Sequence, residues 1–392
     1  MRKFGVRVYG VRMPVIKSGD QLETLVFNEV TAALASEHIT IQDGDVIGIT
    51  ESIVARAQNN YAPIRAIAKD VRTKLGNGPI GLVFPILSRN RFLSLLEGII
   101  NGVDRLIIQL SYPQDEVGNQ ITTLDDIDAH HVNPYFDTFK DDEFRHLFGP
   151  ELLHPFTHCD YPKMYKDLSD KVTIIYANNP REILKYTSKV IAGDIHSRKR
   201  TKRILREAGA EIVIGLDDIL NHPIDGSGYN ADYGILGSNF ASQGVIKLFP
   251  RDAQHLVESI QLKFLQVYQK KIEVLVYGDG AFKDPVGHIW ELADPVVAPF
   301  YTSGLSGTPQ ELKFKMLADT KFVNKTADEA QSLIREEIRH NKTKERKEQA
   351  LGTTPRRLTD LIGSLCDLTS GSGDKGTPVV YIQGYFDNYS DQ

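Results

Sequence analysis

Short apolar runs alternate with segments of helical spacing over the first 110 residues, and this pattern most constrains the fold. The runs at Val46–Thr50, Ile80–Phe84 and Arg105–Ser111 have the length and apolar character of strands covered on both faces. In residues 61–75 and 92–100, apolar side chains recur at the spacing of amphipathic helices. This alternation of strand and helix predicts an α/β domain.

Length and composition narrow the class of protein. A chain of 392 residues exceeds one typical core, so we expect about two or three domains. The apolar share of 41% and charged share of 25% are those of a soluble globular protein. A net charge of −5 is too small to indicate nucleic-acid or membrane binding, and no apolar run approaches the ~20 residues of a membrane helix. We therefore expect a cytoplasmic protein without a nucleic-acid or membrane partner.

The centre of the chain has a different composition and periodicity. Thr122–Asp170 is rich in Asp, His, Phe and Pro and shows no clean periodicity, whereas strand and helix patterns return up to residue 270. We expect residues 120–271 to form a large central insertion or second lobe. Residues 1–119 and 272–392 would then form one core.

Two strand-to-helix junctions near the N-terminus, Arg12–Asp20 and Asp43–Asn60, carry small or charged residues at the crossing. Helix N-termini present unpaired N–H groups and favour anions such as phosphate. Ordinary turns between strand and helix would give the same shape.

The loop Ser370–Gly376 is the most phosphate-like local signal. Its glycines allow backbone N–H groups to approach an anion, and Lys375 adds a positive charge. It contains the pattern G-x-G-x-x-G, but it follows a helix and precedes a strand, the reverse of the dinucleotide fingerprint. The chain contains no P-loop pattern. A flexible hinge is the alternative interpretation.

Two acidic loops follow predicted strands. Asp115, Glu116 and Asn119 lie in one loop, and Asp279 and Asp284 lie in the other. Mg²⁺ is commonly bound by one or two carboxylates together with substrate phosphates, although Asp-rich turns have the same composition.

Basic runs at Arg198–Arg203 and Lys342–Lys347 suggest a weaker alternative, nucleic-acid binding with a steep dependence on salt. A solvated helix face is the commoner explanation of such runs.

Several of these stretches occur together in one known family. RMPVIKSGDQL, DGDVIGITESIVARAQN and the C-terminal GSGDKGTPVVYIQG resemble the opening and closing motifs of coenzyme F420-0:L-glutamate ligases, the F420 gamma-glutamyl ligase family. YPQDEVGN is similar to its first metal-bearing loop, and YGDGAFKDP to its Ser-Asp-Thr loop. The resemblance covers about 1–119 and 272–386 and marks the chain as a longer, divergent member with a mixed-sheet α/β fold.

The resemblance implies an acid–amino-acid ligase that uses GTP, or ATP, with Mg²⁺ or Mn²⁺. Such an enzyme joins L-glutamate to a carboxylate acceptor, a deazaflavin precursor, through a gamma-linked amide and an acyl phosphate. A homodimer is also implied. Asp115 and Asp279 would bind metal. The implied nucleotide-binding residues are Met13, Pro14, Val15, Ile16, Glu51, Ser52, Arg56, Asn119, Gly373, Asp374, Lys375 and Gly376.

Four residues depart from the family pattern. Glu51 and Ser52 replace Gln-Lys, Gly280 replaces Thr, and Lys375 replaces an acid. These changes alter the charge expected around phosphate and metal. They leave two alternatives open: a gamma-glutamyl ligase for another acceptor such as folate, or a non-catalytic or regulatory nucleotide-binding protein.

Overall fold

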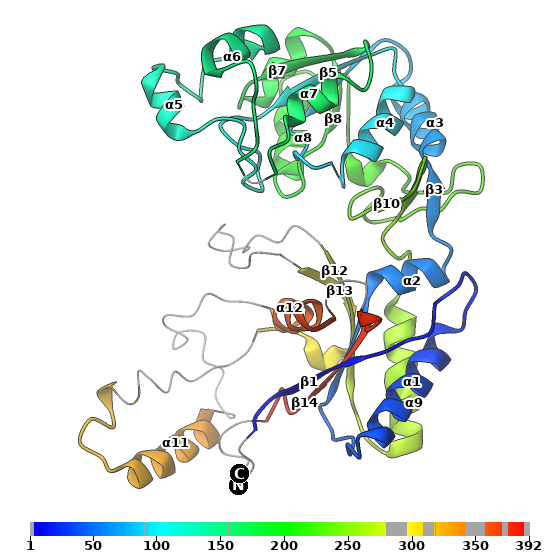
Figure 1. The fold of residues 1–392 in the computed structure, drawn as a ribbon, viewed down its shortest axis with the longest axis vertical. Coiled ribbons are helices and arrows are strands. Elements are labelled where there is room, and N and C mark those ends of the chain that lie inside the picture. The colour runs from blue at the N-terminus through cyan, green and yellow to red at the C-terminus, as the bar shows by residue number, and fades with distance from the viewer. Residues whose placement is uncertain are drawn as a thin grey trace. The chain divides into compact units, whose positions relative to one another are not determined.

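The chain of the computed structural model separates into two units, each built around its own main sheet (Figure 1). The first unit contains Met1–Ile16, Asp20–Val54 and Asp252–Gln392, and the second contains Lys17–Gly19 and Ala55–Arg251. The structure describes residues 4–89, 91–155, 157–279, 296–308, 317, 319–341, 357–370 and 375–387.

The first unit is a five-stranded sheet with helices on both faces. Its elements are β1 (Arg7–Val11), α1 (Leu22–Ser36), β2 (Val46–Thr50), α9 (Gln254–Tyr268), β12 (Glu273–Asp279), β13 (Val296–Tyr301), η3 (Ser303–Leu305), α11 (Ala327–Asn341), α12 (Leu358–Ser370) and β14 (Val379–Gln383). Helix α2 (Glu51–Ala57) crosses the boundary between the units.

The strands of this sheet follow the order β1-β14-β2-β12-β13. β2 and β12 are parallel, whereas β14 is antiparallel to both β1 and β2, so β1, β2 and β12 run in the same direction. Helices α1 and α9 pack together on one face, and α12 covers the other (Figure 1). Because strand side chains alternate between faces, both faces of the central strands are apolar and buried.

Helix α12 packs unusually close to β2 because β2 has a glycine at the contact. A Cβ built on Gly48 would collide with Cys366 Sγ and lie 3.1 Å from Cys366 Cβ. Cys366 is completely buried in a cluster with Val46, Ile362 and Val380. Gly48 therefore sets the spacing between helix and sheet.

We expect Gly48→Ala to destabilise the first unit by about 1–3 kcal/mol, because the added methyl group overpacks this contact. Cys366→Ala should restore part of the loss in the double variant, since it removes the colliding sulfur. Urea denaturation of the single and double variants measures both effects. Gly5→Ala, where the methyl group meets nothing within 4 Å, is the matched control. Equal stability of Gly48→Ala and wild type would contradict the close contact.

The second unit contains a six-stranded and a three-stranded sheet. Its elements are β3 (Tyr61–Pro63), α3 (Ile64–Leu75), β4 (Pro79–Val83), α4 (Leu93–Asn101), β5 (Arg105–Leu110), α5 (Leu124–Ala129), β6 (Phe139–Lys140), α6 (Asp141–Phe148), α7 (Tyr161–Lys166), β7 (Val172–Tyr176), η1 (Pro180–Lys185), β8 (Lys189–Ala192), α8 (Arg198–Glu207), β9 (Ile212–Gly215), η2 (Leu216–Asp218), β10 (Asn239–Ser242) and β11 (Val245–Lys247).

The larger sheet has the order β6-β7-β5-β4-β8-β9, and all its strands except β6 are parallel. Successive strands are added on one side of β4 up to β7 and then on the other side from β8. The order therefore reverses between β4 and β8, as in doubly wound α/β folds. The smaller sheet joins β10, β11 and β3 by antiparallel pairing.

The mixed α/β fold expected from the sequence is confirmed. The units divide differently from the grouping of 1–119 with 272–392, however. Residues 55–119 contribute β4 and β5, which pair with β8 and β7 of the central block in one parallel sheet. The central block is thus completed by strands that precede it in the chain. None of the helices that the structure describes combines the length and the apolar character that a membrane-spanning segment requires.

Candidate functional site

One edge of the five-stranded sheet collects most of the predicted site residues. β1, β2 and β12 all end at this edge, and β14 begins there, because of their directions in the sheet. These strands are neighbours in the order β1-β14-β2-β12. Four segments that are far apart in sequence therefore lie within the width of a few strands at this edge. We call it the ligand edge.

Backbone hydrogen bonds hold two of these segments to the strand that begins at the edge. The Met13 N–H donates to the Gly376 carbonyl at 3.0 Å, and the Thr50 N–H donates to the Pro378 carbonyl at 3.0 Å. The chain leaving β1 and the chain leaving β2 are thereby fixed to the segment that enters β14. The opening and closing motifs of the sequence are thus in direct contact.

The predicted nucleotide-binding residues differ in exposure. Ile16 and Glu51 are buried, whereas Pro14, Val15, Ser52, Lys375 and Gly376 are exposed and Met13 is half-buried. Arg56 is exposed in the last turn of α2 and belongs to the second unit. Gly373, Asp374 and Gly280 lie outside the described residues.

Asp279 is the last residue of β12 and pairs with Val296 of β13. Its backbone therefore lies at the ligand edge, next to the end of β2, whereas its side chain is outside the described part of the structure. The backbone position of Asp279 agrees with the metal-binding role that the resemblance implies.

Asp115 lies in the second unit, in the loop that follows β5, and its carboxylate is already fully engaged. Oδ1 accepts hydrogen bonds from the N–H groups of Val117 and Asn119 at 3.0 and 2.9 Å. Oδ2 accepts from the Leu87 N–H and from Asn119 Nδ2, both at 2.8 Å. Four donors thus fill the acceptor positions of one carboxylate.

Burial raises the pKa of Asp115, and the four hydrogen bonds oppose this effect by stabilising the charged form. Asp115 is only 4% exposed. In this arrangement the carboxylate closes the loop and ties it to the chain after β4, so it does not fit the role of a metal ligand. Metal binding would require Asp115 to release donors. Nor does the described part of the chain contain a group of three or more His, Cys, Asp or Glu residues placed to hold a metal ion.

The neighbouring Glu116 binds the start of helix α8. Its carboxylate accepts hydrogen bonds from the backbone N–H groups of Ile195, His196 and Ser197. An acidic side chain of the protein therefore occupies the position at which a helix N-terminus would attract an anion. The loop after β5 is linked in this way to the loop after β8.

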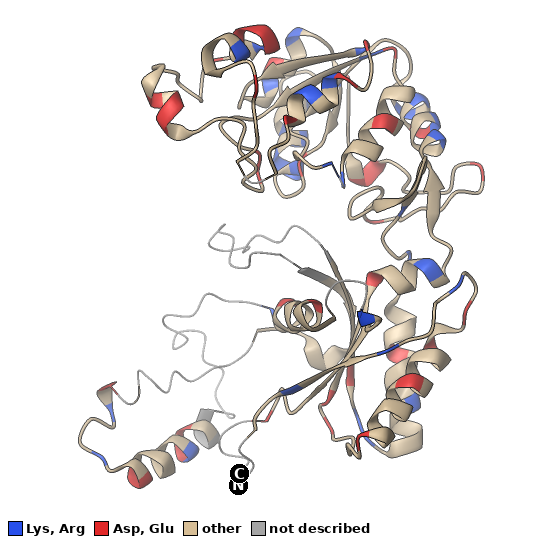
Figure 2. Cartoon of the chain, in the orientation of Figure 1, with Lys and Arg blue, Asp and Glu red and all other residues tan. Residues whose placement is uncertain are grey.

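Three of the five cations in the basic run of α8, whose Lys and Arg residues are blue in Figure 2, have acidic partners within the second unit. Arg198 Nε lies 3.0 Å from Asp217 Oδ1, and Lys202 Nζ lies 3.0 Å from the same oxygen and 2.5 Å from Asp218 Oδ2. The run at Lys342–Lys347 lies outside the described residues. The paired charges of α8 favour the solvated-face interpretation over a nucleic-acid site.

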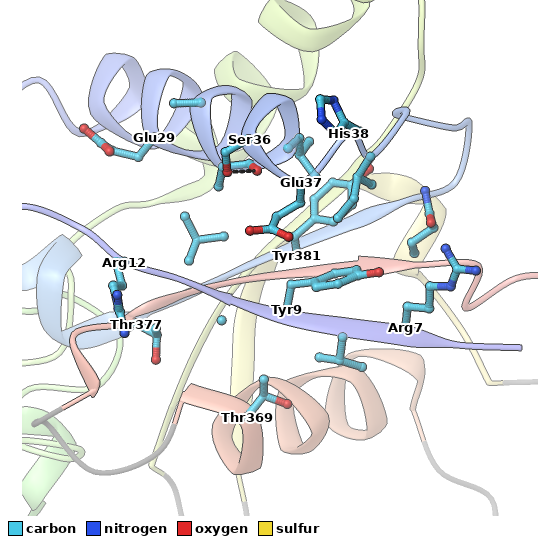
Figure 3. A pocket seen from close by; sticks show the side chains of 18 of the residues that line it. Arg7, Tyr9, Arg12, Glu29, Ser36, Glu37, His38, Thr369, Thr377 and Tyr381 are labelled. Atoms are coloured by element: carbon cyan, nitrogen blue, oxygen red, sulfur yellow. Dashed lines mark hydrogen bonds between the residues drawn. The ribbon is translucent and has the colours of Figure 1, made fainter. Parts of the chain in front are cut away.

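A cavity of about 1680 Å³ lies beside β1 in the first unit (Figure 3). Arg12, Lys375 and Thr377 line the part of it next to the ligand edge, and Arg7 lines it farther along β1. Arg7 was not among the residues that the sequence indicated, and Arg12 was indicated only as the first residue of the junction Arg12–Asp20. Both lie in the run RVYGVR, where two cations flank a short strand, but strand periodicity does not show that α1 leaves open space beside them.

A model of the F420-0:gamma-glutamyl ligase family matches residues 10–384. The chain belongs to this family. Comparison with curated proteins gives no match.

The family match makes the protein an enzyme, a gamma-glutamyl ligase of the F420-0 type, with glutamate and a carboxylate acceptor as substrates. The matched range also includes residues 120–271, for which the sequence motifs had suggested no counterpart in the family.

Proposed function

We propose that this ligase activates the carboxylate of its acceptor with GTP or ATP and a divalent cation, Mg²⁺ or Mn²⁺. The acceptor carboxylate attacks the γ-phosphate and forms an acyl phosphate, releasing the nucleoside diphosphate. The amine of L-glutamate then attacks the acyl carbon, the amide bond forms, and orthophosphate leaves. A homodimer is part of this proposal and rests on the resemblance alone.

The observation that carries the proposal is the meeting of the opening and closing motifs at the ligand edge. Met13 bonds to Gly376, and Glu51 and Ser52 directly follow the end of β2 at the same edge. Ligands of α/β proteins commonly bind outside the carboxyl ends of strands. The family match supplies the reaction class for this edge.

Two cations at this edge suit a phosphate group. Within the described residues, no carboxylate pairs with Arg12 or Lys375, and both side chains are exposed. Phosphoryl transfer depends mainly on positioned charge that neutralises the phosphate oxygens. Lys375 replaces an acid of the family pattern. Side chains of this protein would therefore supply more of the charge that binds phosphate than in members that have the acid.

A divalent cation would supply further charge at the phosphates. We propose Asp279 as a ligand of this cation, and its backbone position at the end of β12 supports the proposal. Asp115 is left out of the proposed metal site, because its carboxylate accepts the four hydrogen bonds described above.

The test is to incubate the purified protein with GTP or ATP, Mg²⁺ or Mn²⁺, L-glutamate and F420-0. We expect orthophosphate and the glutamyl amide in equal amounts, and loss of both when any component is omitted. Folate in place of F420-0 tests the alternative acceptor. Absence of turnover with every acceptor would contradict the proposed reaction.

The acyl phosphate itself is tested by replacing glutamate with hydroxylamine. Hydroxylamine should convert the intermediate to a hydroxamate of the acceptor, with release of orthophosphate. Amide formation without any trapped hydroxamate would contradict this intermediate.

A further inference from the structure

We propose that the cavity beside β1 binds the acceptor, an elongated carboxylic acid with a second anionic group at its far end. The reacting carboxylate would lie at the Arg12–Lys375 end, and Arg7 would bind the second anionic group. This inference rests on the proposed function, because it places the acceptor of that reaction.

The position of the cavity links it to the ligand edge. Arg12 and Thr377 lie at one end of β1, Arg7 lies at the other, and Tyr9 lies between them (Figure 3). Arg12 directly precedes Met13, whose N–H is bonded to Gly376. A ligand in the cavity thus has one end beside the segments that meet at the ligand edge.

The dimensions of the cavity favour the acceptor over L-glutamate. The four-residue step from Arg7 to Val11 corresponds to about 13 Å along a strand. The volume of about 1680 Å³ exceeds the range of roughly 300–1,000 Å³ that is typical of small-molecule pockets. An amino acid as small as glutamate would leave most of this space filled with water, whereas an elongated acceptor spans it.

The charges along β1 favour an anion at each end. Arg12 and Lys375 carry positive charge at the ligand edge, and Arg7 does so at the far end. The Arg7 guanidinium lies 5.8 Å from the centroid of the Phe4 ring, and no carboxylate of the described residues pairs with it. A guanidinium without an acceptor retains its donors for a ligand carboxylate or phosphate.

The opposite wall of the cavity explains which side the anions would occupy. Glu29 and Glu37 of the α1 segment line this wall, and their charge repels an anion. Between the charged ends, half-buried Tyr9 of β1 offers an aromatic ring to the cavity, and the small side chain of Ala32 on α1 also lines it. The cavity therefore suits a ligand with a less polar middle and anionic groups directed toward β1.

The first test fills the cavity without altering the core. Ala32 is an exposed residue of α1 that lines the cavity, and Ala35 is an exposed residue of the same helix that does not. We expect Ala32→Trp to weaken F420-0 binding at least about tenfold, because the indole occupies the space of the ligand, and Ala35→Trp to bind like wild type. Calorimetric titration of F420-0 and of GTP into each protein measures both affinities.

The second test uses the sign of the charge. Arg7→Gln should weaken F420-0 binding by about tenfold, the usual effect of losing a charge-assisted hydrogen bond. Glu37→Gln should strengthen it, because a repulsive charge is removed. Opposite changes in F420-0 affinity would not arise if the two residues acted only on folding. Neither variant should change GTP affinity.

The outcomes separate this inference from the proposed function. The inference is supported if Ala32→Trp loses F420-0 binding and Ala35→Trp keeps it, even if the wild type shows no turnover. Absence of turnover contradicts only the proposed function. Unchanged F420-0 binding in Ala32→Trp overturns the inference even if the wild type is fully active. The inference is also overturned if the wild type does not bind F420-0. The same holds if Ala32→Trp loses GTP binding but still binds F420-0.

Discussion

Replacement of Asp279 by asparagine is expected to lower kcat/KM for amide formation by about 100-fold or more, the usual cost of losing one electrostatic contact to a reacting group. Asp279 ends β12 at the ligand edge, where the family resemblance implies a metal ligand. Asparagine keeps the shape of the side chain but removes the negative charge that would bind the proposed divalent cation. Steady-state kinetics over a range of Mn²⁺ concentrations provide the measurement.

The metal dependence makes this prediction specific. High Mn²⁺ should restore part of the activity of Asp279→Asn, because weaker binding is offset by concentration. Asp319→Asn, at an exposed residue of the first unit, is the control and should retain wild-type kinetics. An Asp279→Asn enzyme with unchanged kcat/KM and unchanged Mn²⁺ dependence would exclude Asp279 as a metal ligand.

Asp194→Asn is expected to stabilise the protein at pH 8 by as much as about 4 kcal/mol. Asp194 follows β8 in the second unit and is only 1% exposed. Its Oδ2 accepts a hydrogen bond from Thr201 at 2.7 Å, whereas no group of the described residues donates to the buried Oδ1. Burial raises the pKa of Asp194 from 3.8 to about 7, and the charge of nearby Glu116 also raises it.

The direction of the pH dependence follows from this raised pKa. Between about pH 4 and pH 7 the folded state retains a proton that the unfolded state has lost, so the free energy of unfolding falls as pH rises through this interval. Above about pH 7 the loss is complete. The difference of about three pH units corresponds to about 4 kcal/mol at 1.36 kcal/mol per unit. Asparagine cannot ionise and avoids this cost.

Urea denaturation at pH 5 and pH 8 measures the effect. The stability gain of Asp194→Asn should be larger at pH 8 than at pH 5. Asp217→Asn is a control of opposite sign, because ion pairs with Lys202 and Arg198 lower the pKa of Asp217 against the effect of its burial. An Asp194→Asn variant less stable than wild type at pH 8 would show that the Asp194 charge is needed in the folded state.

The α/β class follows from the sequence, because buried strands such as Val46–Thr50 and Arg105–Leu110 are continuous apolar runs between amphipathic helices. The sequence also indicated the family, because the opening and closing motifs are contiguous stretches. It gave no account of Thr122–Asp170, where α5, α6 and α7 are only six to eight residues long. Helices of about two turns are too short to show a periodic pattern.

The strands that form each sheet and the partners of each charged residue became known only from the three-dimensional structure. The bond from Met13 to Gly376 and the bond from Leu87 to Asp115 join residues that no local pattern relates. The first brings the predicted nucleotide motifs together, and the second helps to engage the carboxylate of a predicted metal ligand. Strand order and side-chain partners depend on contacts between distant parts of the chain, whereas periodicity reports only on neighbours within one element.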